Sequence, residues 1–408
     1  MVRAKNCSTS LTRNAGTDPV TQDRYDIIVI GGGPAGSSAA LRAAKGGARV
    51  LLLEKQRMPR PKLCGGWVSQ RAIELLDVSL PEGLTTNRFA RTSLVFRDVS
   101  QHYAPTEPLG IFVDRAQFDN FLYEQALAAG ADGRVESVQR IQRDGTDYLV
   151  TCNHGSHRAQ AVILCAGSNS SLITHLRSAD RPDQSAIAVE QTIPVQYAGR
   201  WNLAPGDAWL GFGTVSHGFD WALHHGDRLL VGVGAKRSKV GNIREVFAQI
   251  WENWQLPKEP FAPEGHPIPL GGHKRVLARG RLLSAGDAAG MVDPFNGEGI
   301  AGAIRSGQLA ADSLILDSTA DAARVYTAAC ERELLPELRS ARRVADLFHG
   351  LPDRLIRAFC SDPRLAEDYH DVLRQRMTYA AFLRRLIKRR LFGQTGVVKS
   401  NTSADHAS

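Results

Sequence analysis

The segment over residues 24–54 constrains the fold of this chain more than any other part of it. RYDIIVI is a short apolar run typical of a buried strand, and GGGPAG is a glycine-rich turn that continues into the alanine-rich SSAALRAAKGG. ARVLLLEK then supplies a second apolar run, which ends near Glu54. The pattern predicts a strand–turn–helix–strand unit of the Rossmann type.

The glycines of this turn suit a dinucleotide. Gly31 permits the tight turn, Gly33 lets the backbone approach a pyrophosphate, and Gly36 lets the helix pack on the strand. The helix N-terminus supplies unpaired N–H groups for the phosphates. Glu54 lies 18 residues after Gly36 and is placed to accept a hydrogen bond from a ribose hydroxyl. We therefore expect dinucleotide binding at this unit.

A second stretch, over residues 285–300, favours FAD over NAD. AGDAAG follows an apolar strand and carries Asp287 at the strand's end, and a further helix opens near Gly299. Two strand ends that converge on one long ligand suit FAD, with Asp287 accepting from the ribityl chain. The helix N-terminus near Gly299 would favour negative charge on the reduced flavin ring. The alternative is an Asp287 that only caps a helix.

The order of these motifs resembles that of flavoproteins similar to the aromatic hydroxylases. GGGPAGSSAA, VDRAQFD, AVILCAG and LLSAGDAAGMVDPFNGEGIAGAIRSG follow one another as in that superfamily. Within it, KLCGGWVSQRAIELL resembles the Lys-x-Cys-Gly-Gly segment of the geranylgeranyl reductase family. HGFDWALHHGDRLLVGVG resembles that family's substrate-domain signature, and GHPIPLGG its short segment before the last FAD-binding stretch. The resemblance covers about residues 24–330, and Cys-Gly-Gly is its more specific part.

The resemblance implies FAD, a hydroxylase-like fold, and reduction of isolated C=C bonds in isoprenoid chains. The reductant would be NAD(P)H or a reduced electron carrier. Cys64, Gly65 and Gly66 would line the flavin side of the active site. Phe219 and Trp221 would belong to the substrate cavity. The residues expected to bind FAD are Gly31, Gly33, Pro34, Ala35, Gly36, Glu54, Lys55, Arg115, Gly286, Asp287, Gly299 and Ile300.

Two segments depart from the family pattern. The usual Tyr-x-Trp-x-Phe-Pro is FDWALH over residues 219–224, without the phenol and without the proline. The usual Asp-Gly after the third strand is Ala166-Gly167. The first departure lies in the segment that would contact a polyprenyl substrate, so it weakens the prediction of that substrate. The second weakens the prediction that NADPH is bound as in the hydroxylases.

The implied reaction needs a hydride from the flavin and a proton for the other carbon. The candidate proton donors are Cys64, His224, His225 and an ordered water. A cysteine that is only small enough for a glycine-flanked loop is the alternative for Cys64. His224 and His225 are neighbours in a predicted strand and point to opposite faces, so they do not easily share a metal ion.

The six cysteines of the chain show no CxxC pair and no metal-ligand spacing. We therefore expect no metal site, no redox disulfide, and a reducing, cytoplasmic location. Cys152 and Cys165 lie in apolar, strand-like surroundings, where cysteine behaves as a small hydrophobe.

The positive charge of the chain is concentrated near its C-terminal end. Residues 374–391 hold seven Arg or Lys and no acid, which accounts for +7 of the net charge of +8. The rest is near neutral, which argues against nucleic acid as a partner. Apolar residues at helical spacing in this segment predict an interfacial helix at an anionic membrane surface. A helix docked on the core is the alternative.

We predict an α/β fold with a Rossmann-like, hydroxylase-like FAD domain, a mostly antiparallel substrate domain and a helical C-terminal region. Two disordered tails would flank these parts. The predicted ranges are 24–184 with 276–330 for FAD, 185–275 for substrate, 331–395 for the helical region, and 1–23 and 396–408 for the tails.

The favoured function is FAD-dependent saturation of C=C bonds in an isoprenoid or similarly apolar substrate. One rival is a monooxygenase or halogenase acting on a small apolar molecule. Halogenases are expected to carry Trp-x-Trp-x-Ile-Pro and a placed lysine, and we find neither in the sequence. The other rival is an electron-transfer flavoprotein that docks on a membrane or a partner, which the absence of an apolar cavity beside the flavin would favour.

Overall fold

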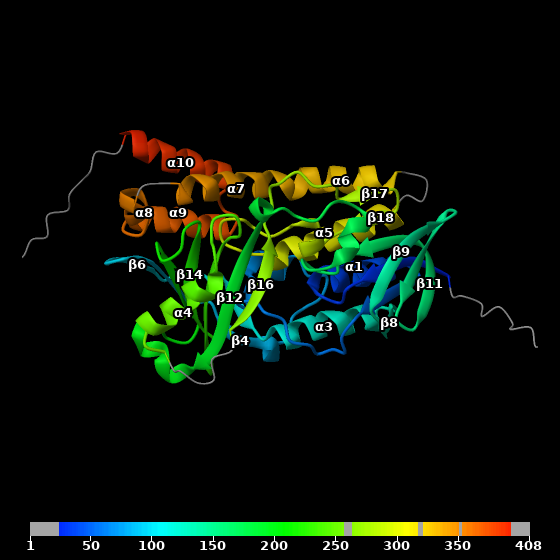
Figure 1. Ribbon diagram of the computed structural model, residues 1–408, viewed down its shortest axis with the longest axis horizontal. Coiled ribbons are helices and arrows are strands. Elements are labelled where there is room, and N and C mark those ends of the chain that lie inside the picture. Colours follow the sequence, from blue (N-terminus) through cyan, green and yellow to red (C-terminus); the bar gives the residue numbers. More distant parts are fainter. Residues whose placement is uncertain (1–23, 257–262, 317–320, 351–352, 393–408) are drawn as a thin grey trace, which may run out of the picture.

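The computed structural model describes residues 24–256, 263–316, 321–350 and 353–392 (Figure 1). Two large sheets stand side by side, and the helices of the C-terminal region run along one edge of both (Figure 1). The predicted α/β class, with a Rossmann-like region, antiparallel sheets and C-terminal helices, is confirmed. The predicted tails, over residues 1–23 and 396–408, lie outside the described residues.

The first sheet is built around the predicted strand–turn–helix–strand unit. Its strand order is β17-β18-β11-β1-β2-β8, and β10 and β9 continue from β11 as an antiparallel meander. The pairings β18–β11, β11–β1, β1–β2 and β2–β8 are parallel. The strands are β1 (Arg24–Ile30), β2 (Val50–Glu54), β8 (Asp132–Val135), β9 (Val138–Asp144), β10 (Asp147–Cys152), β11 (Gly155–Leu164), β17 (Ala278–Arg279) and β18 (Leu282–Ser284).

Both faces of this sheet are covered, which explains its unbroken apolar runs. Ile27 and Val29 of β1 face a core shared with helices α1 (Pro34–Lys45), α3 (Arg115–Ala128) and α5 (Ile300–Ile315). Ile28 and Ile30 of the same strand face the other way, into a core shared with the β9–β10 meander. Helix α1 follows β1 directly, as its glycine turn predicts.

The second sheet has the strand order β16-β12-β15-β14-β13-β5-β6. Its pairings are antiparallel except for β13 with β5. The predicted substrate domain, 185–275, contains most of this sheet, and we propose that residues 91–103 join it because β5 and β6 pair there. The strands are β5 (Arg91–Phe96), β6 (Val99–Tyr103), β12 (Ser185–Pro194), β13 (Asp207–Phe212), β14 (Gly218–His224), β15 (Arg228–Lys236) and β16 (Glu264–Pro269).

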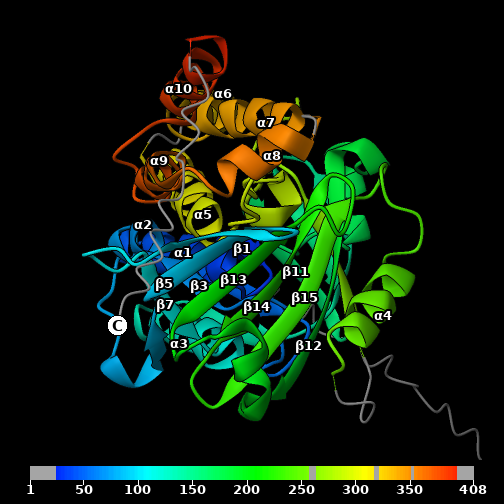
Figure 2. The same cartoon turned by 90° about the vertical axis from the view of Figure 1, so that its left-hand side faces the viewer.

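Strand β15 shows why the two faces of this sheet differ. Val231 and Val233 are fully buried in a core with helix α4 (Ile243–Asn253), which covers one face (Figure 2). Gly232 and Gly234 point to the other face, since side chains alternate along a strand. A Cβ atom added to Gly232 would lie 2.4 Å from the indole ring of Trp221, so glycine makes room for that ring.

A small third sheet and the remaining helices complete the fold. The sheet pairs β3 (Trp67–Ser69) and β4 (Thr85–Arg88) with β7 (Gly110–Val113), and α2 (Gln70–Glu74) follows β3. Pro336 and Pro363 lie in the first turns of α7 and α9, whereas Pro352 lies outside the described residues. The C-terminal helices are α6 (Ala322–Glu333), α7 (Leu335–His349), α8 (Asp353–Phe359), α9 (Pro363–Leu373) and α10 (Tyr379–Phe392). Short 3-10 helices lie at Glu82–Leu84, Ser171–His175, Pro182–Gln184, Val195–Trp201 and Gly286–Ala289.

Helix α10 contains most of the basic segment predicted to bind a membrane. Tyr379 and Phe382 are buried in the core formed with α7 and α9, and Leu383 and Leu386 pack against it. Ile387 is 41% exposed. Most of the apolar face of α10 is therefore packed on the core, as in the alternative of a docked helix. Among the described helices, none is long and apolar enough to cross a bilayer.

Candidate active site

The glycine turn between β1 and α1 meets the steric requirements of a dinucleotide site. A Cβ atom on Gly36 would lie 1.8 Å from the carbonyl oxygen of Gly31, so only glycine lets the helix approach the turn. Gly31 has a φ of 106°, which L side chains rarely adopt. By contrast, a Cβ atom on Gly33 would meet only an Arg60 nitrogen, at 3.5 Å. The space over Gly33 and the N-terminus of α1 is therefore open, as phosphate binding requires.

Glu54 ends β2 beside this turn. Its carboxylate accepts hydrogen bonds from the backbone N–H groups of Gly32, at 2.8 Å, and Gln56, at 3.1 Å. Arg60, which the sequence analysis missed, lies 3.4 Å from Glu54 and 3.5 Å from Asp119. A carboxylate has about four acceptor positions, so Glu54 keeps capacity for the ribose hydroxyl assigned to it.

The second FAD motif lies across the same space. Gly286 has a φ of 61°, and a Cβ atom on it would lie 2.8 Å from the Cβ of Ala35 in α1. The strand end that carries Asp287 can therefore approach α1 closely. Gly299 caps the N-terminus of α5, and its Cβ position is 3.8 Å from an Asp287 oxygen. Asp287 does not cap α5, which has no side-chain cap.

One cavity of about 740 Å³ joins these elements. It runs past the N-termini of α1 and α5 and along the end of β2, which is the elongated path that FAD requires. Gly36 and Gly286 are packed behind its wall and do not line it. The predicted FAD residues that line it are Gly31, Gly33, Pro34, Ala35, Glu54, Lys55, Arg115, Asp287, Gly299 and Ile300.

The same cavity continues over the second sheet, where its lining is apolar and aromatic. The face of the sheet that carries Gly232 and Gly234 also carries Phe219 and Trp221, both of which line the cavity as predicted for a substrate region. Side chains from the third sheet and the C-terminal helices also line this part of the cavity. The main apolar lining residues are Trp67, Phe89, Phe112, Ala188, Leu210, Phe212, Phe219, Trp221, Leu223, Ile268, Val292, Phe295, Phe359, Tyr369 and Leu373.

Polar side chains gather where the two parts of the cavity meet. Arg115 is buried and makes a bidentate ion pair with Asp119, at 2.9 and 3.0 Å, and Cys64 lies near its guanidinium. Burial opposes its charge, but Asp119 and Cys64 hold the pKa of Arg115 above its usual range. Cys64 therefore lies beside a permanent cation in the cavity wall.

Lys62 and His266 form a pair in the same wall, with Nζ and Nε2 2.8 Å apart. Burial and the adjacent lysine lower the pKa of His266 to about 4, so its ring is neutral and accepts from the ammonium group. Burial also lowers the pKa of Lys62. The sequence analysis assigned no role to either residue, although Lys62 is the lysine of the Lys-x-Cys-Gly-Gly segment.

Glu190 is the one acidic side chain on β12, and it too was missed. It is 7% exposed and lines the cavity near the Cys64 loop. Burial raises its pKa to about 7, although Lys62, the Cys64 N–H and Arg115 act in the opposite direction. The sequence did contain a signal for this residue, because Glu190 is an acid inside an otherwise uncharged, largely apolar strand.

The loop over residues 64–66 differs in part from the prediction. Cys64 and Gly65 line the cavity, but Gly66 does not. Gly66 has a φ of 69°, and a Cβ atom there would lie 2.5 Å from the Val113 carbonyl and 2.8 Å from the His225 ring. Protein packing, and not approach to a flavin, thus requires this glycine.

The two histidines proposed as weak proton donors lie outside the cavity lining. His224 is buried and its Nδ1 accepts from the backbone N–H of Gly226, at 3.0 Å. His225 Nε2 lies 3.0 Å from the Gly65 carbonyl oxygen, to which it donates. Burial lowers the pKa of His225 to about 4. Both rings bond to backbone groups of loops, so we do not propose either histidine as a proton donor to the substrate.

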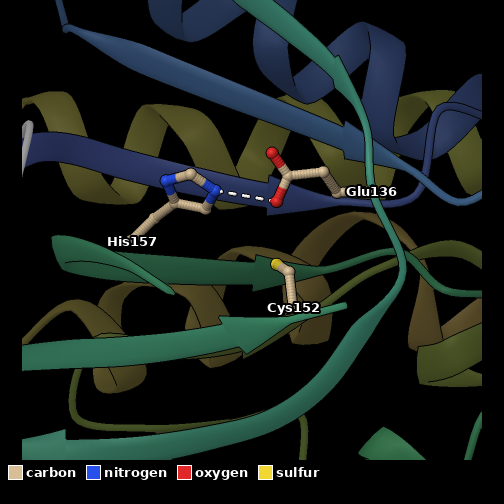
Figure 3. A group of neighbouring side chains, drawn as sticks. All are labelled: Glu136, Cys152 and His157. Carbon is tan, nitrogen blue, oxygen red and sulfur yellow. Dashed lines mark hydrogen bonds and ion pairs between the residues drawn. The ribbon is translucent and has the colours of Figure 1, made fainter. Parts of the chain in front are cut away.

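A further polar group lies at the meander strands of the first sheet, and its Glu136 also lines the cavity (Figure 3). His157 Nε2 is 2.9 Å from Glu136, and Cys152 lies beside them. The three potential ligand atoms lie within 4.8 Å of one another, so spacing along the chain was not enough to judge metal binding. Cys152 is buried in the apolar core of this sheet, as predicted.

Comparisons with known proteins agree with this geometry. Residues 26–131 match the family model described as FAD dependent oxidoreductase. The chain is 29% identical to a geranylgeranyl diphosphate reductase of Rhodobacter capsulatus, covering 88% of this chain and 92% of that protein. It is 26% identical to digeranylgeranylglycerophospholipid reductase 1 of Methanothermobacter thermautotrophicus, covering 89% and 95%.

Solved structures show the same fold. A geranylgeranyl bacteriochlorophyll reductase-like protein of Thermoplasma acidophilum superposes with a TM-score of 0.76 at 21% identity, covering 90% of this chain and 95% of that one. A flavin-dependent brominase superposes with a TM-score of 0.66 at 17% identity, covering 90% and 100%. The chain is an FAD-dependent oxidoreductase enzyme, and its resemblance to the geranylgeranyl reductases is confirmed.

The two glycines of the turn give a first prediction. Gly36→Ala should destabilise the FAD-free protein by about 1–3 kcal/mol, because its Cβ would overlap the Gly31 carbonyl. Gly33→Ala, the matched control, should leave the unfolding midpoint of the FAD-free protein unchanged and weaken FAD binding. Urea unfolding and flavin titration measure both. Equal destabilisation by the two variants would contradict this account of the turn.

The cysteines give a second prediction. Brief alkylation near pH 8 should modify Cys64, which lines the cavity, before the other described cysteines. Burial raises the pKa of Cys152, Cys330 and Cys360 to about 12, and also raises that of Cys165, so their reactive thiolates are scarce. Peptide mass mapping measures the order, and earlier modification of Cys152 would show that the Glu136 group is more open than described.

Proposed function

We propose that this enzyme saturates C=C bonds of an isoprenoid chain or a similarly apolar substrate. The observation that carries the proposal is the single cavity, in which an FAD-binding end and an aromatic, apolar end meet at Cys64. A hydrocarbon chain offers no hydrogen-bonding groups, so a site for it needs apolar walls and a shape that orients it. The aromatic residues of β14 and the C-terminal helices supply both.

The two ends of the cavity suggest separate roles for the cofactor and for the residues of the chain. When bound and reduced by NAD(P)H or a reduced electron carrier, FAD supplies the hydride. The chain's own residues hold the cofactor through the two glycine turns and the helix N-termini. Phe219, Trp221 and Phe295 pack along the substrate and exclude water, which keeps the hydride from unproductive reactions.

The named relatives support an apolar substrate. One is named as a reductase of geranylgeranyl diphosphate and the other as a reductase of a digeranylgeranyl glycerophospholipid. Both names contain the same isoprenoid chain on different polar groups. The feature that this enzyme would share with them is therefore recognition of the chain.

A monooxygenase or halogenase is the second candidate. The similarity to the brominase fold favours it. Of the two features expected of halogenases, Trp-x-Trp-x-Ile-Pro is not found in the sequence, and the lysine in the cavity, Lys62, belongs to the Lys-x-Cys-Gly-Gly segment that resembles the geranylgeranyl reductases. The electron-transfer reading loses support, because an apolar cavity adjoins the FAD-binding end.

A membrane surface remains part of the proposal. The exposed side chains of α10 include Arg384, Ile387 and Lys388, which suit an anionic lipid surface. The basic segment would then bring the cavity to prenyl lipids. The buried Tyr379 and Phe382 take no part, because they are packed in the core.

The direct test is anaerobic turnover followed by mass spectrometry. Purified enzyme with reduced FAD and a panel of prenyl alcohols, diphosphates and lipids should give products heavier by steps of two hydrogens. Turnover should be unchanged in the strict absence of oxygen. A product that gains one oxygen or a halogen would contradict the proposed reductase activity. Flavin that passes electrons only to a quinone or a protein would establish the electron-transfer function.

Cys64→Ala separates a chemical from a structural role of the Cys64 loop. We expect the variant to bind FAD normally, because the cofactor contacts come from other elements, and to show altered turnover or product distribution. Flavin titration and product analysis measure this. Loss of FAD from Cys64→Ala alone would mean that the loop is a structural clamp. Cys360→Ala, a buried cysteine outside the cavity lining, is the control.

A further inference from the structure

We infer that Glu190 is the catalytic acid that gives a proton to the substrate carbon opposite the one that receives the hydride. The inference rests on the proposed C=C reduction and adds to it a residue that neither the motifs nor the relatives point to. It is carried by the place of Glu190 in the cavity, beside the Cys64 loop.

The register of the second sheet puts Glu190 on the substrate side. Glu190 pairs with Gly232 of β15 on one side and with Glu264 of β16 on the other. Gly232 in turn pairs with Trp221 of β14. Residues paired directly across strands share a face, so the glutamate and the indole lie on the same face, with the indole over Gly232. Both line the cavity.

The Cys64 loop brings this carboxyl group to the FAD-binding end. Cys64 and Glu190 both line the cavity, and the backbone N–H of Cys64 is near enough to Glu190 to act on its pKa; Arg115 of α3 acts on it from the same side. A substrate double bond held against Cys64 would therefore have the carboxyl group within reach. This is the geometric requirement for a general acid.

The surroundings of Glu190 favour a protonated acid near neutral pH. Lys62 and Arg115 face it and favour its charge, and Glu264 across the sheet disfavours it. Burial outweighs the cations and raises the pKa of Glu190 to about 7, from an ordinary 4.5. The remaining charged or titratable groups of this wall are His266, which is neutral and bound to Lys62, and Cys64.

The proposed step balances in atoms and electrons. One alkene carbon accepts the hydride that reduced FAD supplies, and the π electrons of the double bond form the second C–H bond with the proton of Glu190. The carboxyl O–H bond breaks and leaves a carboxylate, the substrate gains two hydrogens, and the cofactor is oxidised. Glu264 is exposed, lines the same cavity and lies next to Glu190 in register, so it marks the side from which water returns the proton.

Cys64 is the competing donor, and the two assignments make different predictions for single variants. If Glu190 is the acid, Cys64→Ala changes the fit of the substrate but leaves a proton source in place. If Cys64 is the acid, its removal abolishes turnover and Glu190→Gln only alters the charge nearby. The pair of variants therefore separates them.

The test compares Glu190→Gln with Glu252→Gln in FAD-loaded enzyme. Glu190→Gln should bind FAD and accept electrons from the reductant at the wild-type rate, yet reduce the prenyl substrate at least about 100-fold more slowly. Glu252, an exposed acid of α4 that does not line the cavity, is the control, and Glu252→Gln should stay within about threefold of wild type. Turnover of Glu190→Gln within threefold of wild type would overturn the inference.

A second readout does not depend on turnover. The folded protein holds the Glu190 proton more tightly than the unfolded chain does, so wild type should lose stability as pH rises from about 4.5 to 7. Glu190→Gln cannot ionise and should lack that part of the loss. Thermal unfolding of the FAD-free proteins between pH 4.5 and 8 measures the difference. Parallel curves for the two proteins would contradict a raised proton affinity of Glu190.

The two readouts also distinguish failure of the inference from failure of the proposed function. If wild type reduces no prenyl substrate, the proposed function fails, and the acid role of Glu190 fails with it. If wild type reduces the substrate and Glu190→Gln does so equally well, only the inference is wrong.

Discussion

The active site depends on how residues 64–66 are held between two sheets. The carbonyl of Gly66 accepts from the backbone N–H of Val113 in β7, at 2.9 Å, and the carbonyl of Gly65 accepts from His225 after β14, at 3.0 Å. The close approach at Gly66 leaves no space for a Cβ atom. These contacts fix the loop between the small third sheet and the second sheet, and so bring Cys64 to the meeting point of cofactor and substrate regions.

The electrostatics of the junction follow from burying charged groups in an apolar cavity. Burial disfavours every charge there, and each group responds according to its partner. Arg115 keeps its charge because Asp119 pairs with it, and His266 becomes neutral beside Lys62. Glu190 has cations nearby, but no described side chain forms an ion pair with it, and its proton is therefore retained to a higher pH. An acid that is neutral near pH 7 and lies among apolar side chains suits proton transfer to an alkene, because an alkene has no charged group that would pair with a carboxylate.

The sequence predicted the cofactor end far better than the chemical end. The glycine motifs are local, so the spacing of Gly31, Gly33 and Gly36 was sufficient to predict a turn that the structure contains. Phe219 and Trp221 are two residues apart on one strand, so their place on the same face of the sheet was also predictable from a short stretch of sequence. Glu190 and Lys62 come together only through strand order and loop packing, which no spacing along the chain encodes. Gly66 was assigned to the flavin because its true neighbours, Val113 and His225, are far away in the sequence.

The central claim is that the aromatic cavity over the second sheet takes a hydrocarbon chain and presents it to the FAD-binding end. A crystal structure of the FAD-loaded enzyme with a bound long-chain prenyl alcohol tests it most directly. We predict that the chain lies over the Trp221 indole, which covers Gly232 and Gly234, and against Phe295, with a double bond beside Cys64 and the Glu190 carboxyl group. A chain bound on α10 or outside this cavity, with the aromatic lining closed on itself, would contradict the account.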